Sequence, residues 1–139
     1  MNWKYFKLSE FIKSNTAEKL KIDNNPSSDD INNLDLLVKN ILDPLREAWG
    51  KPIKITSGYR STKLNKIVGG VNNSDHIYGR AADIQPIGEN FDEFLKFIKD
   101  WIKDKNFKQF IIERKGNTRW IHLSYDPKNN KRDIKIINK

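Results

Sequence analysis

The chain contains no cysteine, and its N-terminal segment has no long apolar run. The absence of cysteine excludes disulfide bonds and thiolate metal sites, so any bound metal would depend on histidine and carboxylate ligands. The first eleven residues include Lys4, Lys7 and Glu10, which argues against a signal peptide or a membrane span there. We therefore expect no transmembrane segment.

The chain also lacks any dense block of lysine and arginine, although its net charge is +8. A positive surface of this kind favours polyanions such as nucleic acid, anionic lipid or anionic wall polymers. Because the lysines are spread along the whole chain without a nucleic-acid-binding motif, we expect no specific nucleic-acid partner. A generally cationic surface is an equally good interpretation.

Length and composition predict one folded domain covering residues 1–139. The chain is 37% hydrophobic and contains four tryptophans, which is enough to build a core. We found no internal repeat, low-complexity segment or linker. The oligomeric state is left open.

Apolar residues at spacings of three and four predict two long helices. The first follows a capping signal at Ser27 and Asp30, and its apolar stripe runs from Ile31 to Leu45. Pro44 predicts a kink near Asp43. The predicted helices cover residues 8–12, 31–49, 62–68 and 91–102.

Alternating or short apolar runs predict the strands. They cover residues 53–56, 81–85, 107–113, 119–125 and 134–137. Pro86 is expected to stop the second strand, and Gly116-Asn117 forms the turn between the third and fourth. The order of elements predicts an α+β fold, with helices packed on one side of a small, mainly antiparallel sheet.

The two histidines of the chain and one aspartate form a candidate metal site. His76 lies in the segment 74–83, which ends at Asp83, and His122 lies in a predicted strand. Two imidazoles and a carboxylate are a common catalytic zinc set with a fourth position open for water. The alternatives are a hydrogen-bonding role for His76 and an arginine salt bridge for Asp83. The buried position expected for Asp83 favours a cation.

The spacing of these residues resembles that of a known family. The pattern Ser-x-His-x-x-Gly-x-Ala-x-Asp at 74–83, followed by Trp-x-His at 120–122, resembles zinc peptidases that cut bacterial cell-wall peptides. They include D-Ala-D-Ala carboxypeptidases, D-Ala-D-Ala dipeptidases and phage L-alanyl-D-glutamate endopeptidases. The resemblance covers roughly residues 26–126. It implies the hedgehog/DD-peptidase fold, a zinc cofactor and a peptidoglycan peptide substrate.

The segment 57–61 also resembles a family signature, which implies that Arg60 contacts a substrate carboxylate or carbonyl. An arginine that fastens its own loop is an equal alternative. Arg60 or Gln109 would donate to the oxyanion of the reaction.

The general base is the point at which the chain departs from its relatives. Many members carry Glu or Asp three residues before the last zinc histidine, where this chain has Arg119, which cannot accept a proton. The predicted hairpin pairs Glu113 with Trp120 and places Glu113 diagonal to His122 on one face. Gln109-x-Ile-x-Glu113 also resembles phage-associated members, so we predict Glu113 as the base. The alternative is a solvated Glu113 paired with Arg114 or Arg119.

These observations predict a zinc metallopeptidase of peptidoglycan stem peptides. It would be a D-Ala-D-Ala carboxypeptidase or an L-Ala-D-Glu endopeptidase, with the phage-like features favouring a lysin. Without a signal peptide, the protein is expected to be cytoplasmic until released, or virion-associated. A zinc-containing cell-wall-binding module with weakened catalysis is the alternative.

Overall fold

The computed structural model describes residues 2–139 and has the predicted α+β architecture. Its strands are β1 (Ile53–Ser57), β2 (Ala81–Pro86), β3 (Gln109–Lys115), β4 (Thr118–Ser124) and β5 (Asp133–Asn138). They form one sheet in the order β1-β2-β4-β3-β5. Every neighbouring pair is antiparallel except β3 and β5, so the sheet is mainly antiparallel as predicted.

The helices are mostly short. The α-helices are α1 (Leu8–Ile12), α2 (Asn15–Leu20), α3 (Ser28–Leu37), α4 (Asp43–Trp49), α5 (Thr62–Ile67) and α6 (Phe91–Trp101). Three further turns are π-helical or 3₁₀: η1 (Val38–Leu42), η2 (Asp75–Tyr78) and η3 (Ile102–Asp104). The sequence pattern did not predict α2. No helix within residues 2–139 combines the length and apolar character that membrane crossing requires.

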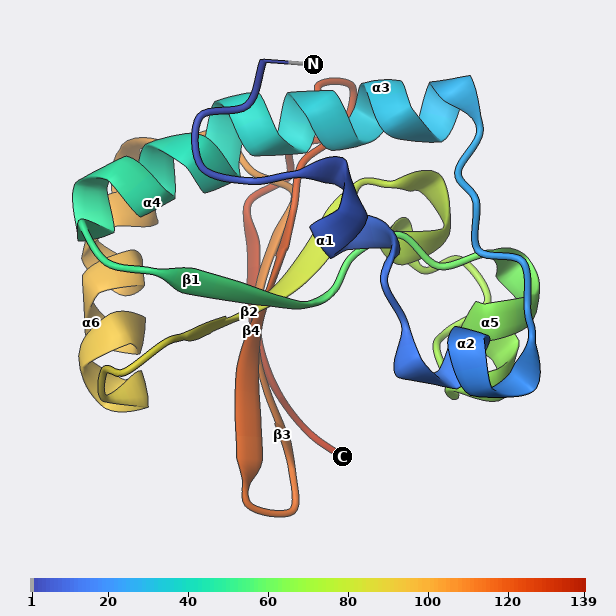
Figure 1. Cartoon of the computed structure of the whole chain (residues 1–139). Helices are drawn as coiled ribbons and strands as arrows, with labels where there is room; N and C mark the ends of the chain where they lie inside the picture. The colour runs from blue at the N-terminus through green and yellow to red at the C-terminus, as the bar shows by residue number, and fades with distance from the viewer. Residues whose placement is uncertain (1) are drawn as a thin grey trace.

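The first long helix consists of α3, η1 and α4, which follow one another across the molecule (Figure 1). It begins with the predicted cap: Ser27 Oγ accepts a hydrogen bond from the backbone N–H of Asp30 at 3.2 Å, and the Asp30 carboxylate accepts one in return. Pro44 lies in the first turn of α4, where its missing N–H is tolerated. The helix is irregular at the π turn, one turn before Pro44.

The helix-facing side of the sheet forms the core. Ile84, Phe110 and Ile121 are buried there, together with side chains of α3, α4 and α6. Their strand neighbours point to the opposite face, because successive side chains alternate. That opposite face carries polar side chains, and Figure 1 shows the β3–β4 hairpin projecting away from the α3–α4 helix.

The hairpin has the predicted register. A two-residue turn joins β3 to β4, and Glu113 pairs with Trp120 and Ile111 with His122. The prediction for β2 was one residue short, because Pro86 still belongs to the strand and pairs with Ile53. Pro86 is tolerated at the end of the strand, where the absence of an N–H matters least.

Candidate metal centre

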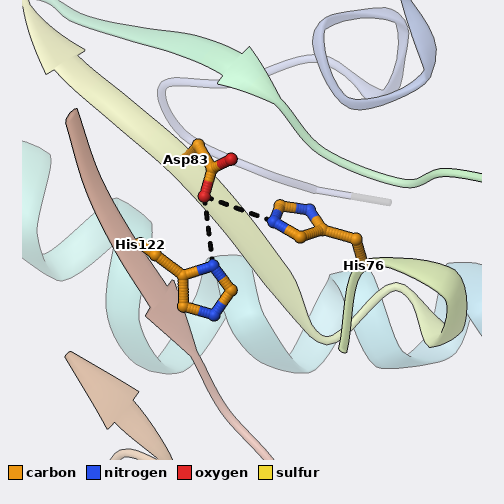
Figure 2. A group of neighbouring side chains, drawn as sticks. All are labelled: His76, Asp83 and His122. Carbon is orange, nitrogen blue, oxygen red and sulfur yellow. Dashed lines mark hydrogen bonds and ion pairs between the residues drawn. The ribbon is translucent and has the colours of Figure 1, made fainter. Parts of the chain in front are cut away.

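Three side chains from separate segments converge on the polar face of the sheet. His76 comes from the 3₁₀ turn η2, Asp83 from β2 and His122 from β4, where it pairs directly with Asp83. Asp83 Oδ1 lies 3.2 Å from His76 Nε2 and 3.1 Å from His122 Nδ1 (Figure 2). All three side chains are buried, and their candidate ligand atoms lie within 4.8 Å of one another.

A backbone carbonyl fixes the tautomer of His76. Its Nδ1 lies 2.7 Å from the carbonyl oxygen of Gly58, which can only accept a hydrogen bond. Nδ1 of a neutral ring therefore carries the proton, and Nε2 directs a lone pair at Asp83. Burial lowers the pKa of His76, although the charge of Asp83 opposes the shift, so the neutral ring is favoured at neutral pH.

Gln109, on the neighbouring strand β3, fixes the tautomer of His122. Its Oε1 lies 3.2 Å from His122 Nε2, which leaves the lone pair of Nδ1 directed at Asp83. The predicted role of Gln109 was donation to an oxyanion. In the structure its carbonyl oxygen accepts from the imidazole, and donation from its amide nitrogen to an oxyanion stays a prediction.

The three donor atoms fit a divalent cation such as zinc. Two neutral imidazole nitrogens and a carboxylate oxygen all present lone pairs to one small region, which is unfavourable unless a cation lies between them. The two distances from Asp83 Oδ1 to the imidazole nitrogens, 3.2 and 3.1 Å, are close to the edge of about 3.3 Å of a tetrahedron with bonds of about 2.0 Å.

Arg60 borders this cluster and also fastens its own loop. Its Nε donates to Ser57 Oγ at 3.1 Å and its Nη1 to Asn65 Oδ1 at 2.8 Å, while Nη2 lies 3.7 Å from Asp83 Oδ2. Burial lowers the pKa of the Arg60 guanidinium, and the carboxylates of Asp83 and Glu113 oppose that shift. The geometry thus accommodates both readings of Arg60.

Glu113 lies on the same face as His122, and its carboxylate is buried. Oε2 accepts a hydrogen bond from Trp120 Nε1 at 2.6 Å, and Oε1 forms an ion pair with Lys139 Nζ at 2.9 Å. The expected alternative partners, Arg114 and Arg119, make neither contact. The sequence pattern did not predict the contact between Lys139 and Glu113. The predicted edge strand ended two residues earlier, at residue 137.

Arg119 lies on the other face of the sheet. Strand residues three positions apart point to opposite faces, so Arg119 cannot share the side of His122. Its Nη1 instead contacts Asp92 Oδ1 at 2.7 Å, and its guanidinium stacks 4.5 Å from the Phe91 ring of α6. In this strand geometry, a side chain at position 119 cannot serve as the general base, whatever its type.

The turn that carries His76 is docked tightly onto α3. Asn33 Nδ2 donates to the carbonyl oxygen of Tyr78 at 2.9 Å. Gly79 has a φ of 70°, and a Cβ there would lie 2.4 Å from the carbonyl oxygen of Asp30. A buried ion pair between Asp75 and Lys108 at 2.7 Å ties the same turn to the segment before β3. The sequence alone did not indicate this support.

A cleft of about 1060 Å³ is lined by Asp83, one of the three candidate ligands. Strand β1 lines one side of it, and Arg60, Asp83, Trp120 and Lys139 also contribute. It also carries further cations at Lys13, Lys54 and Lys115. The cleft therefore offers a positively charged path to the metal cluster.

Comparisons with known proteins agree with this geometry. A family model described as Peptidase M15 matches residues 4–124. The zinc D-Ala-D-Ala carboxypeptidase of Streptomyces albus G is 45% identical over 51 residues, which are 36% of this chain and 20% of that protein. The matched segment thus spans about a fifth of the relative's length.

Proposed function

Because this chain belongs to the peptidase M15 family, whose members are zinc metallopeptidases, we propose that it hydrolyses peptide bonds in peptidoglycan stem peptides. The observation that carries the proposal is the convergence of His76, Asp83 and His122, of which Asp83 lines a cleft. We assign these three side chains as the ligands of the zinc ion. We infer the substrate class from the activity that the Streptomyces relative is named for and from the motif resemblance.

The chain's own residues supply the remaining chemistry. When bound, zinc lowers the pKa of water and polarises a carbonyl group. Glu113 accepts the proton of the attacking water and later returns it to the leaving amine. Each of its oxygens has two lone pairs, so the hydrogen bond from Trp120 and the ion pair with Lys139 leave capacity for this step.

Arg60 orients the substrate in this proposal. Its guanidinium is partly engaged by Ser57 and Asn65, which hold the plane in place, and it lies within 3.7 Å of Asp83 at the edge of the cleft. A fixed guanidinium can donate two parallel hydrogen bonds to a carboxylate, or one to a peptide carbonyl. The first mode fits a carboxypeptidase, and the second fits an endopeptidase.

Mass spectrometry of purified peptidoglycan fragments tests the proposal. The zinc-loaded protein is incubated with fragments that carry complete pentapeptide stems. Loss of a terminal D-Ala identifies a D-Ala-D-Ala carboxypeptidase, whereas release of the stem after L-Ala identifies an L-Ala-D-Glu endopeptidase. Chelator-treated protein and Asp83→Ala are the matched controls. Fragments left intact by protein with one zinc per chain would overturn the proposal.

A binding module is the second candidate, because both oxygens of Glu113 are engaged by other side chains, one by the Trp120 N–H and one by the Lys139 ammonium. It predicts that zinc-loaded protein cosediments with intact sacculi but releases no peptide. Release of peptide at a rate that depends on zinc would exclude it. A role as a phage lysin rests on the motif resemblance and is tested by lysis of sacculi from whole cells.

A further inference from the structure

We propose that Lys139 is a positioning residue that holds the carboxylate of Glu113 in its working orientation. The inference rests on the proposed function, in which Glu113 is the general base. It concerns a residue outside the part of the chain that the family model matches, which ends at residue 124. The motif resemblance likewise ends before β5.

The backbone places Lys139 beside Glu113. Strand β5 pairs in parallel with β3, with Ile137 opposite Glu113 and Asn138 opposite Arg114. The pairing continues for one more residue, because the N–H of Lys139 donates to the carbonyl oxygen of Arg114 at 2.6 Å. The side chain then reaches back over the sheet, and Nζ lies 2.9 Å from Glu113 Oε1.

Two donors of different kinds fix the carboxylate. Trp120 Nε1 donates a hydrogen bond to Oε2 at 2.6 Å, and Lys139 Nζ forms an ion pair with Oε1, so rotation of the carboxylate would disturb at least one contact. The side chain of Glu113 is only 8% exposed, which makes a lost partner costly because little water can replace it. Lys139 Nζ also lies 5.7 Å from the centroid of the Trp120 ring, which joins the three side chains in one cluster.

Lys139 is half exposed and lines the cleft, whereas Glu113 is buried. Truncation of the Lys139 side chain therefore leaves the packing of the sheet intact and frees only the carboxylate of Glu113. A general base that moves by about 1 Å loses a large part of its rate advantage, while substrate binding elsewhere in the cleft is retained. This predicts an effect on kcat and little effect on KM.

The experiment compares Lys139→Ala, Lys139→Arg and the control Lys135→Ala. Lys135 lies on the same strand with similar exposure, and its Nζ pairs with Asp133 at 3.1 Å. We expect Lys139→Ala to lower kcat by about 10-fold with KM changed by less than about twofold. Lys139→Arg should restore most of kcat, and Lys135→Ala should match wild type. Zinc content should be equal in all four proteins, and Tm should fall only in Lys139→Ala, which leaves a buried carboxylate with one partner fewer.

An NMR measurement on the zinc-free protein provides a readout independent of turnover. The indole N–H of Trp120 donates to Glu113, so its proton resonance reports the position of the carboxylate; Trp120→Phe assigns the peak. Lys139→Ala should shift this resonance, and Lys135→Ala should not. Wild-type kcat or an unmoved resonance in Lys139→Ala would overturn the inference. Full activity in Glu113→Gln would instead remove Glu113 from the proposed function, and an inactive wild type would remove the function itself.

Discussion

The two faces of the sheet differ in what they bury. On the helix side, Ile84 and Ile121 are fully buried among apolar side chains. On the cleft side, their strand neighbours Asp83 and His122 are almost as buried but polar. Adjacent residues of one strand therefore serve two environments, because side chains alternate between faces.

The difference separates stability from chemistry. Apolar burial on the helix side supplies the free energy that holds the strands in register. Buried polar groups on the cleft side lower the free energy of unfolding, since carboxylates and imidazoles are costly to bury without a cation or full hydrogen bonding. Substitutions on the two faces should therefore have different signatures.

The largest effect is expected from Asp83→Ala, compared with Asp92→Ala as a matched carboxylate on the helix side. Asp83→Ala should abolish stoichiometric zinc binding and all activity, and Asp92→Ala should retain both. Zinc at 1,000 times its Kd should stabilise the wild type by about 4 kcal/mol and leave Asp83→Ala unchanged. Metal analysis and thermal melts with and without zinc measure this. Stoichiometric zinc in a His76→Ala/His122→Ala double variant would refute the assignment.

Glu113→Gln is next, because it changes one oxygen of a buried carboxylate and leaves the three candidate ligands in place. Loss of a general base should lower turnover by about 10²-fold or more while zinc content stays at one per chain. Steady-state kinetics on a purified stem peptide measure the effect. Glu93→Gln, on α6, serves as the control. Unchanged kinetics in Glu113→Gln would leave the base unidentified.

Ile84→Val tests the helix side at the position next to Asp83. Removing one methylene from a fully buried side chain should lower the free energy of unfolding by about 1 kcal/mol. Zinc stoichiometry and kcat should stay at wild-type values, because the side chain faces away from the cleft. Urea denaturation measures the stability change. A loss of zinc in this variant would show that the two faces are coupled.

The smallest effect is expected from Arg119→Glu, which introduces the residue type usual in relatives. Arg119 faces α6, so a carboxylate there cannot reach the metal cluster and activity should not rise. It would lie beside Asp92, and the lost ion pair should lower Tm slightly. Kinetics and a thermal melt measure both effects. A large gain in peptidoglycan cleavage would instead favour a weakened enzyme and the binding-module reading.

The sequence predicted the fold from local patterns, whereas the meeting of His76, Asp83 and His122, which the structure shows, was implied by the resemblance to a known family. Alternation in the hairpin and the two-residue turn at Gly116-Asn117 determine which residues share a face, so the pairing of Glu113 with Trp120 followed directly. The small number of histidines also simplified the prediction of the metal ligands, since a chain with two histidines offers few choices for imidazole ligands.

The supporting contacts could not be predicted, since they join residues far apart in the chain. Lys139 reaches Glu113 only through parallel pairing of β5, and no local pattern specifies that partner strand. The carbonyl of Gly58 has no sequence signal at all, because every residue has one. Arg119 lies three positions before His122, so strand alternation places the two side chains on opposite faces.

The direct pairing of Asp83 with His122 has a consequence for quality control of the protein. A slip of one residue between β2 and β4 would turn one ligand toward the helices and leave the other in the cleft. A misregistered chain could then no longer gather three donors, so zinc would bind only correctly folded molecules and enrich them by mass action. Zinc binding would therefore select chains with the correct strand register. The zinc occupancy of a purified batch would report the fraction of chains that folded correctly.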